Sequence, residues 1–182
     1  IVKIKIIMNI CIIGNSLTGL SLAKNLINKK INVHIYHENK TKDFSSGRTI
    51  GISKNNLEFF KKEILNINKN FLWQINEIEI FSQKLKKENL LRFKKDQSEL
   101  FYMIKNKDLY ESLIRKVSKN KFFKKSLIKK DSFYTDLLKK NKFDLIINCE
   151  SNNLLSRKFF VNKINKDYNN LAYTVILKHK KI

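Results

Sequence analysis

The residues best suited to chemistry form a short turn, Gly14-Asn15-Ser16-Leu17-Thr18-Gly19. Between a strand and a helix, the first glycine of such a turn permits a tight reversal, and the last lets the helix pack closely on the strand. Free backbone N–H groups and the helix dipole then hold a pyrophosphate. The spacing predicts that all six residues contact a dinucleotide, and a plain strand-turn-helix connection is the alternative.

Ser16 departs from the usual pattern, because a glycine normally stands at this position so that the backbone can approach the phosphates. A serine hydroxyl can instead donate a hydrogen bond to a phosphate oxygen. Asn15 is compatible with the turn because asparagine tolerates a left-handed backbone better than most residues. The turn alone therefore predicts a phosphate site with one altered contact.

A carboxylate that binds the ribose diol is expected about 20 residues past such a turn. The commonest spacing reaches His37, and Glu38 comes next. We predict that Glu38 binds the ribose, with a merely solvated glutamate as the alternative. A neutral His37 imidazole could bond a ribose hydroxyl, or His37 is a surface residue without a role.

The elements that would position these residues are visible in the hydrophobic pattern. Residues 10–13 form a continuous apolar run, as in a strand buried on both faces. From Leu17 the apolar residues recur at helical spacing, and residues 33–36 predict a second buried strand. Residues 10–36 are therefore a βαβ unit, and the chain is of the α/β class.

Further elements are predicted along the rest of the chain, and residues 118–142 are too lysine-rich to assign. Ile78 and Ile80 alternate with glutamates, which predicts a strand with one covered face. Inserted β structure is expected between about residues 76 and 105. The other expected elements are an extended segment 48–52, a helix 55–67, strands 91–93 and 101–104, a helix 106–117 and a buried strand 143–148.

Composition limits the partners. The 182 residues are 42% apolar, enough for one substantial core, and the formal net charge is +22. That charge first suggests nucleic acid, but lysines are scattered, and arginine, the preferred reader of base edges, occurs only four times. We predict no nucleic-acid partner and leave open a weak attraction to anionic membrane surfaces. The oligomeric state is not predicted.

The cysteines and the chain ends suggest a cytoplasmic protein. Cys11 and Cys149 have neither metal-site nor CxxC spacing, so no metal site is predicted. No apolar run reaches the about 18 residues that cross a bilayer. The interrupted apolar run of residues 1–13 lacks a signal-peptide cleavage site. We expect Met8 to be the start and residues 1–7 to be an upstream leader outside the fold.

Several segments, in order, resemble the class A flavoprotein monooxygenases and, within them, the ubiquinone-biosynthesis aromatic hydroxylases. The family's opening strand, glycine turn and helix are similar to residues 10–26, and its arginine-centred segment resembles residues 46–53, around Arg48. A later tyrosine-centred segment resembles residues 102–107, with Lys107 where an arginine is usual. A segment that begins the family's substrate-domain sheet resembles residues 167–172.

The family's GADG segment is similar to Asn148-Cys149-Glu150-Ser151, followed by Arg157. Only the acid at Glu150 and the arginine at Arg157 match the family in residue type. The resemblance implies a Rossmann-like FAD-binding domain of the glutathione-reductase type over residues 8–160. It implies a truncated start of the substrate-domain sheet over residues 161–182. The family's second flavin motif would fall beyond Ile182, so we expect a fragment that is not active alone.

The resemblance implies a FAD-dependent hydroxylase in which NAD(P)H reduces FAD and oxygen hydroxylates an electron-rich ring. Its substrate would be an aromatic compound such as a prenylated phenol, which suits a cytoplasmic protein peripheral to the inner membrane. Arg48 is expected near the flavin, or is an ordinary surface arginine, and no catalytic triad is expected in this part of the chain.

Other functions remain open from the sequence. The chain could belong to another FAD enzyme, of the prenyl-lipid reductase or halogenase type. It could instead be a non-catalytic remnant or basic binding module that kept the fold. A plain NAD-binding protein would leave the segments around Arg48 and Tyr102 without an explanation.

Overall fold

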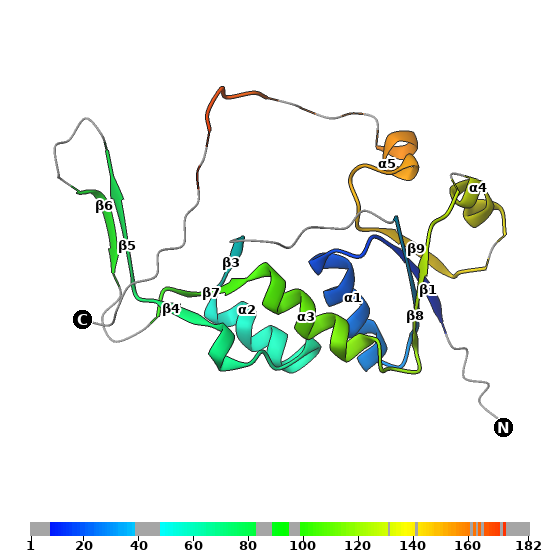
Figure 1. Cartoon of the computed structure of the whole chain (residues 1–182), viewed down its shortest axis with the longest axis horizontal. Helices are drawn as coiled ribbons and strands as arrows, with labels where there is room; N and C mark the ends of the chain where they lie inside the picture. Colours follow the sequence, from blue (N-terminus) through cyan, green and yellow to red (C-terminus); the bar gives the residue numbers. More distant parts are fainter. Residues whose placement is uncertain are drawn as a thin grey trace.

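The computed structural model describes residues 8–38, 48–82, 89–94, 99–130, 132–140, 142–160, 162, 164, 166–171 and 173. A four-stranded parallel sheet, of strand order β8-β2-β1-β9, forms one end of the molecule (Figure 1). Its strands are β1 (Asn9–Ile13), β2 (Asn32–His37), β8 (Phe123–Leu127) and β9 (Leu145–Asn148).

Strand β1 lies in the middle of this sheet and is buried on both faces, as its apolar run predicts. Ile10 and Ile12 join the core beneath α1 and α3, and Cys11 and Ile13 join a second cluster beneath α4 and α5. Helices therefore cover both faces (Figure 1). Their bounds are α1 (Leu17–Asn28), α3 (Asn106–Val117), α4 (Ser132–Lys139) and α5 (Leu154–Phe159).

The βαβ prediction is confirmed. Helix α1 begins after Ser16, whose hydroxyl caps it, and its buried residues Leu20, Ala23 and Ile27 follow the helical spacing. Helix α1 ends before Lys30, which adopts a positive φ of 61°. Helix α3 has the predicted bounds.

The second predicted helix is shorter than expected. It comprises α2 (Lys54–Phe59) and a π-helical turn, η1 (Phe60–Ile64), and the backbone becomes extended at Leu65. The side chains of Asn25 and Asn28 donate hydrogen bonds to carbonyls at the end of this turn. A 3₁₀ turn, η2 (Lys69–Phe71), follows.

The antiparallel strands form two separate units. Strands β3 (Thr49–Ile52), β7 (Phe101–Lys105) and β4 (Trp73–Ile75) form a sheet in the order β3-β7-β4. Among the described residues, strands β5 (Glu77–Phe81) and β6 (Asn89–Lys94) pair only with each other, and they lie at the far end of the molecule from the parallel sheet (Figure 1).

The prediction of a covered face on the strand at Ile78 and Ile80 is wrong, because the hairpin of β5 and β6 stands apart from the core. Ile80 is 40% exposed. Phe81, and Leu91 on the paired strand, are both more than half exposed. An alternating pattern indicates which residues share a face, but it does not indicate that another element covers that face.

Two other segments differ from the sequence analysis. The unassigned residues 118–142 contain β8 and α4. The predicted buried strand 143–148 begins at Leu145 and is the edge strand β9, with Leu145 exposed and the next three residues half-buried. Its apolar run does not distinguish an edge position from a central one.

Some predictions fall outside the described residues, namely the leader 1–7, the part of the arginine-centred segment before Arg48, and much of 161–182. The described residues of 161–182 lie in no helix or strand, and the proposed domain division stays a prediction. Within the described ranges, no helix is both long enough and apolar enough to cross a membrane.

Candidate functional site

The predicted glycine turn joins β1 to α1 at the carboxyl edge of the parallel sheet. Gly14 has a φ of +109°, which an L side chain rarely adopts, so a glycine is required there. The turn is held on both sides, because the Gly14 N–H donates to the Tyr36 carbonyl and the Cys149 N–H donates to the Ile13 carbonyl, both at 2.8 Å.

Gly19 permits the close approach of helix and turn that the pattern predicts. A Cβ at this position would lie 2.4 Å from the Gly14 carbonyl oxygen, closer than real Cβ contacts. Because the obstructing atom belongs to the backbone, no side-chain rotation could relieve the overlap. The first and last glycines therefore have the structural roles expected of a phosphate-binding turn.

Ser16 has a role that the sequence analysis did not assign. Its Oγ accepts a hydrogen bond from the Gly19 N–H at 3.3 Å and so caps α1. Its own O–H remains able to donate to a phosphate oxygen. The N–H groups of Leu17 and Thr18 have no acceptor among the described residues, and α1 carries no acidic residue in its first turn.

Asn15 connects the turn to α3. Its Nδ2 donates to the Tyr110 hydroxyl at 2.6 Å, while its Oδ1 is buried and has no hydrogen-bond partner within the described chain. The Oδ1 of Asn106, at the start of α3, is also buried without such a partner. A buried acceptor without a donor costs free energy, so both oxygens fit hydroxyl or N–H donors of a ligand.

Arg48 and Lys107 lie beside this connection. The Asn106 N–H donates to the Arg48 carbonyl at 2.9 Å, which joins the start of β3 to the first turn of α3. Both Arg48 and Lys107 are exposed, and the Lys107 ammonium lies 4.0 Å from Glu111 on the same helix. No contact links either cation to the turn within the described residues, so their cofactor roles stay predictions.

His37 and Glu38 end β2 at the same edge of the sheet. Nδ1 of His37 lies 3.1 Å from the Glu38 carbonyl oxygen. One carboxylate oxygen of Glu38 accepts a hydrogen bond of 3.0 Å from the Tyr134 hydroxyl on α4. Glu38 is thus half-buried and held by a neighbouring helix, which the sequence analysis did not foresee.

Cys149 and Glu150 follow β9, the third strand that ends at this edge of the sheet. A Cβ on Gly14 would lie 3.2 Å from the Glu150 Cβ, so this residue packs directly against the turn. Burial raises the pKa of the Cys149 thiol, and it raises that of Cys11 to about 12. Both cysteines are therefore neutral thiols rather than nucleophilic thiolates.

A buried polar network that the sequence analysis missed fixes this strand end. Asn153 is 1% exposed and caps α5 by accepting from the Ser156 N–H at 2.8 Å. Its Nδ2 donates to the Asn148 Oδ1 at 2.8 Å, and the Ser156 hydroxyl donates to the Glu150 carbonyl at 2.7 Å. An asparagine directly before Leu154 and Leu155 is a helix N-cap signal that was available in the sequence.

These features fit the diphosphate and ribose of a dinucleotide. Within the described part of the chain, the turn offers N–H groups without an acceptor at the positive end of a helix of 12 residues, and Gly19 lacks the side chain that would separate helix from turn. Glu38 lies at the end of the adjacent strand, where a ribose diol would be bound. Ser16 is a departure from the glycine pattern within this turn, and it changes one contact.

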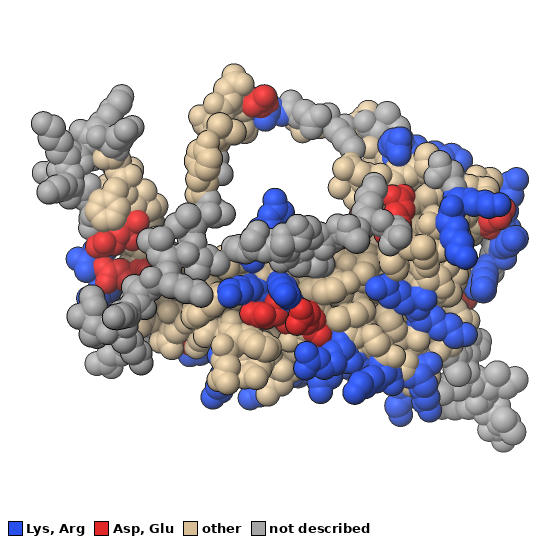
Figure 2. Space-filling view, viewed as in Figure 1, with Lys and Arg blue, Asp and Glu red and all other residues tan. Residues whose placement is uncertain are grey.

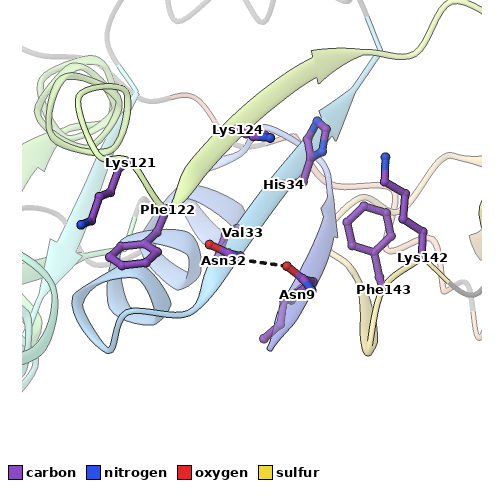
Figure 3. A pocket seen from close by; sticks show the side chains of 10 residues that line it. Asn9, Asn32, Val33, His34, Lys121, Phe122, Lys124, Lys142 and Phe143 are labelled. Atoms are coloured by element: carbon purple, nitrogen blue, oxygen red, sulfur yellow. Dashed lines mark hydrogen bonds between the residues drawn. The ribbon is translucent and has the colours of Figure 1, made fainter. Parts of the chain in front are cut away.

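The structure also has a cavity of about 410 Å³ at the opposite, amino edge of the sheet (Figure 3). Lys124 and Lys142 flank His34 there, and the rings of Phe122 and Phe143 form its walls. Burial, Lys142 and Lys124 together lower the pKa of His34 to about 4. None of the predicted site residues lines this cavity.

On the face shown in Figure 2, lysines and arginines lie in separate groups with uncharged and acidic side chains between them. The absence of a nucleic-acid partner remains a prediction.

No protein-family model matches the sequence, and no curated protein matches it. Solved structures do resemble the fold. PqsL of Pseudomonas aeruginosa, described as a probable FAD-dependent monooxygenase, matches with a TM-score of 0.54 and 12% identity over 66% of this chain and 32% of its own. The p-nitrophenol 4-monooxygenase PnpA of Pseudomonas putida DLL-E4 matches with a TM-score of 0.54 and 10% identity, over 66% of this chain and 32% of its own.

A third similar structure is 2-methyl-3-hydroxypyridine-5-carboxylic acid oxygenase, with a TM-score of 0.54 and 13% identity, over 67% of this chain and 32% of its own. The chain therefore spans about a third of the length of the solved structures it matches. At these identities the likeness establishes the fold alone. The chain has the α/β fold found in part of these monooxygenases, as the sequence analysis predicted.

Proposed function

We propose that this chain forms the FAD-binding part of a FAD-dependent aromatic-ring hydroxylase, a monooxygenase that uses NAD(P)H and oxygen. The observation that carries the proposal is the glycine turn, with its unpaired N–H groups at the start of α1. Its setting in a fold shared with monooxygenase structures supports FAD over other dinucleotides. When bound, FAD would supply the redox chemistry with NAD(P)H and oxygen.

The protein's own residues would bind and orient the cofactor. Leu17 and Thr18 would donate their N–H groups to the diphosphate, and Glu38 would accept hydrogen bonds from the adenosine ribose. The Oδ1 atoms of Asn15 and Asn106 would accept hydrogen bonds from ligand groups. Arg48 would provide positive charge near the flavin.

We further propose a prenylated phenol of ubiquinone biosynthesis as the substrate of the whole protein. This step rests on the sequence resemblance around Arg48 and Tyr102. A net charge of +22 suits peripheral contact with an anionic membrane surface, where a prenylated substrate would be found. A cytoplasmic location follows from the same proposal.

A second candidate, a chain that kept the fold without the cofactor, has one observation in its favour. Ser16 stands where the pattern has a glycine, and its Oγ accepts the Gly19 N–H that a diphosphate would otherwise use. Binding of FAD by the purified chain separates the two candidates.

The test is a fluorescence titration of FAD with the wild-type chain and with matched arginine variants. The proposal predicts saturable binding that Arg48→Ala weakens by roughly 3- to 30-fold, as loss of one charged contact would. Arg115→Ala is the control, because this exposed arginine lies in the last turn of α3. A wild-type chain that stays free of FAD would contradict the proposal and favour the second candidate.

A further inference from the structure

Helix α4 reaches the candidate site through a single buried tyrosine. Tyr134 is 3% exposed and packs in the cluster formed by Cys11, Ile13 and Leu137. Its hydroxyl donates a hydrogen bond of 3.0 Å to a carboxylate oxygen of Glu38, 96 residues away in the sequence. Figure 1 shows α4 on the face of the sheet opposite to α1 and α3. The contact therefore joins the covering layer to the end of β2.

We propose that Tyr134 is a positioning residue that holds the Glu38 carboxylate in place for the adenosine ribose of the cofactor. The inference rests on the proposed function and adds a residue from outside the βαβ unit. A carboxylate has about four lone-pair sites on its two oxygens, so a bond from a tyrosine to one oxygen is compatible with bonds from ribose hydroxyls. A carboxylate that is already fixed loses less conformational entropy when the ribose binds.

The surroundings of Tyr134 favour a fixed rather than a mobile hydroxyl. Phe133 lies edge-on to its ring, with 5.5 Å between the ring centroids, and Tyr36 in turn packs against Phe133 at 4.6 Å. A tyrosine held this way presents its hydroxyl at one position, and a buried hydroxyl normally requires a partner. Glu38 supplies that partner at the point where the ribose would bind.

The test compares the binding of ADP and 2′-deoxy-ADP to the full chain by calorimetry. These probes share the diphosphate and differ in one ribose hydroxyl. The wild-type chain is expected to prefer ADP by roughly 3- to 10-fold, the range that one hydrogen bond contributes. Tyr134→Phe removes only the hydroxyl, and it should abolish most of this preference.

The controls separate positioning from packing. Tyr36→Phe alters a tyrosine of the same cluster without touching the Glu38 carboxylate, and it should keep the preference. Glu38→Gln should remove the preference, and adding Tyr134→Phe to it should change little more. If Tyr134 had a purely structural role, Tyr134→Phe would weaken the binding of both ligands equally and leave the ratio of their affinities unchanged.

The possible results of this test separate the inference from the proposed function. A Tyr134→Phe variant that retains the full preference for ADP overturns the inference while the proposed function stands. A wild-type chain that binds both ligands equally shows that Glu38 is not at the ribose, and the inference fails with that assignment. A wild-type chain that binds neither ligand contradicts the proposed function itself.

Discussion

The two edges of the parallel sheet offer different surroundings to a ligand. At the carboxyl edge, the turn after β1 presents N–H groups at the amino end of α1 that have no acceptor among the described residues, and Glu38 follows the end of the neighbouring strand. At the amino edge lies a cavity of about 410 Å³ with lysines and a partly buried histidine (Figure 3). The carboxyl ends of α1 and α3, which are the negative ends of their helix dipoles, lie at this second edge. Lysines near these ends stabilise the helices whether or not a ligand is bound.

Cavity size and positive charge do not by themselves identify a phosphate site. Lysines at the amino edge can rearrange and are exposed, whereas the N–H groups of Leu17 and Thr18 are fixed by the backbone. Directed donors at a helix amino end suit a diphosphate better than mobile ammonium groups. The proposed function therefore assigns the cofactor to the carboxyl edge.

The largest expected effect comes from filling the space between turn and helix. Gly19→Ala would place a Cβ 2.4 Å from the Gly14 carbonyl oxygen. We expect the free energy of unfolding to fall by about 1–3 kcal/mol. FAD binding should weaken by about tenfold or more, which corresponds to about 1.4 kcal/mol. Urea unfolding and FAD titration measure the two effects.

Gly51→Ala is the matched control for this substitution. Its Cβ would lie 3.2 Å from the Phe101 ring, a side chain that can move, and FAD affinity should not change. Equal loss of affinity in both variants would mean that Gly19 acts through general stability and not through the turn.

A second prediction concerns the buried network at the end of β9. Asn153→Ala removes the cap of α5 and leaves the Asn148 side chain without one of its partners. We expect the free energy of unfolding to fall by about 2 kcal/mol, as measured by urea unfolding. Asn152→Ala changes an exposed neighbour and should have little effect. Equal stability of the two variants would show that the network does not hold this edge.

A smaller effect is expected at Ser16, where the departure from the glycine pattern can be reversed. Ser16→Ala should lower the free energy of unfolding by about 1 kcal/mol, and Ser16→Gly by only a few tenths. Ser16→Gly also releases the Gly19 N–H from the serine oxygen, so FAD should bind more tightly than to the wild type. Weaker FAD binding by Ser16→Gly would instead assign the serine hydroxyl a direct bond to the phosphate.

The smallest expected effect lies at the amino edge. His34 has a pKa of about 4 in the folded chain, below its ordinary value of 6.5, so the unfolded chain binds its proton more readily between these values. The free energy of unfolding should therefore fall as the pH drops from 6.5 towards 4. His34→Gln should flatten this dependence in urea unfolding while leaving FAD affinity at neutral pH unchanged. A steeper pH dependence in the variant would contradict the assignment.

The βαβ unit and its turn were predictable because their signals are local. A continuous apolar run, glycines at fixed offsets and helical spacing from Leu17 determine β1, the turn and α1 without knowledge of distant residues. Helix α3 was predicted for the same reason. Its apolar positions Leu109, Leu113 and Val117 form one stripe, and all three are buried.

The missed features depend on distant partners. Tyr134 meets Glu38 only after folding, and lysines around α4 obscured the spacing of Tyr134 and Leu137. The edge position of β9 and the exposure of Ile80 depend on which elements pack beside them. No periodicity within a strand contains that information.

The most direct test of the central claim is an NMR titration of the isotope-labelled full chain with FAD, followed at the backbone amides of both sheet edges. The account predicts saturable shifts at Leu17 and Thr18, and no comparable shifts at Asn32 and Phe143 beside the amino-edge cavity. The absence of saturable shifts at the turn, or shifts confined to the cavity residues, would contradict it.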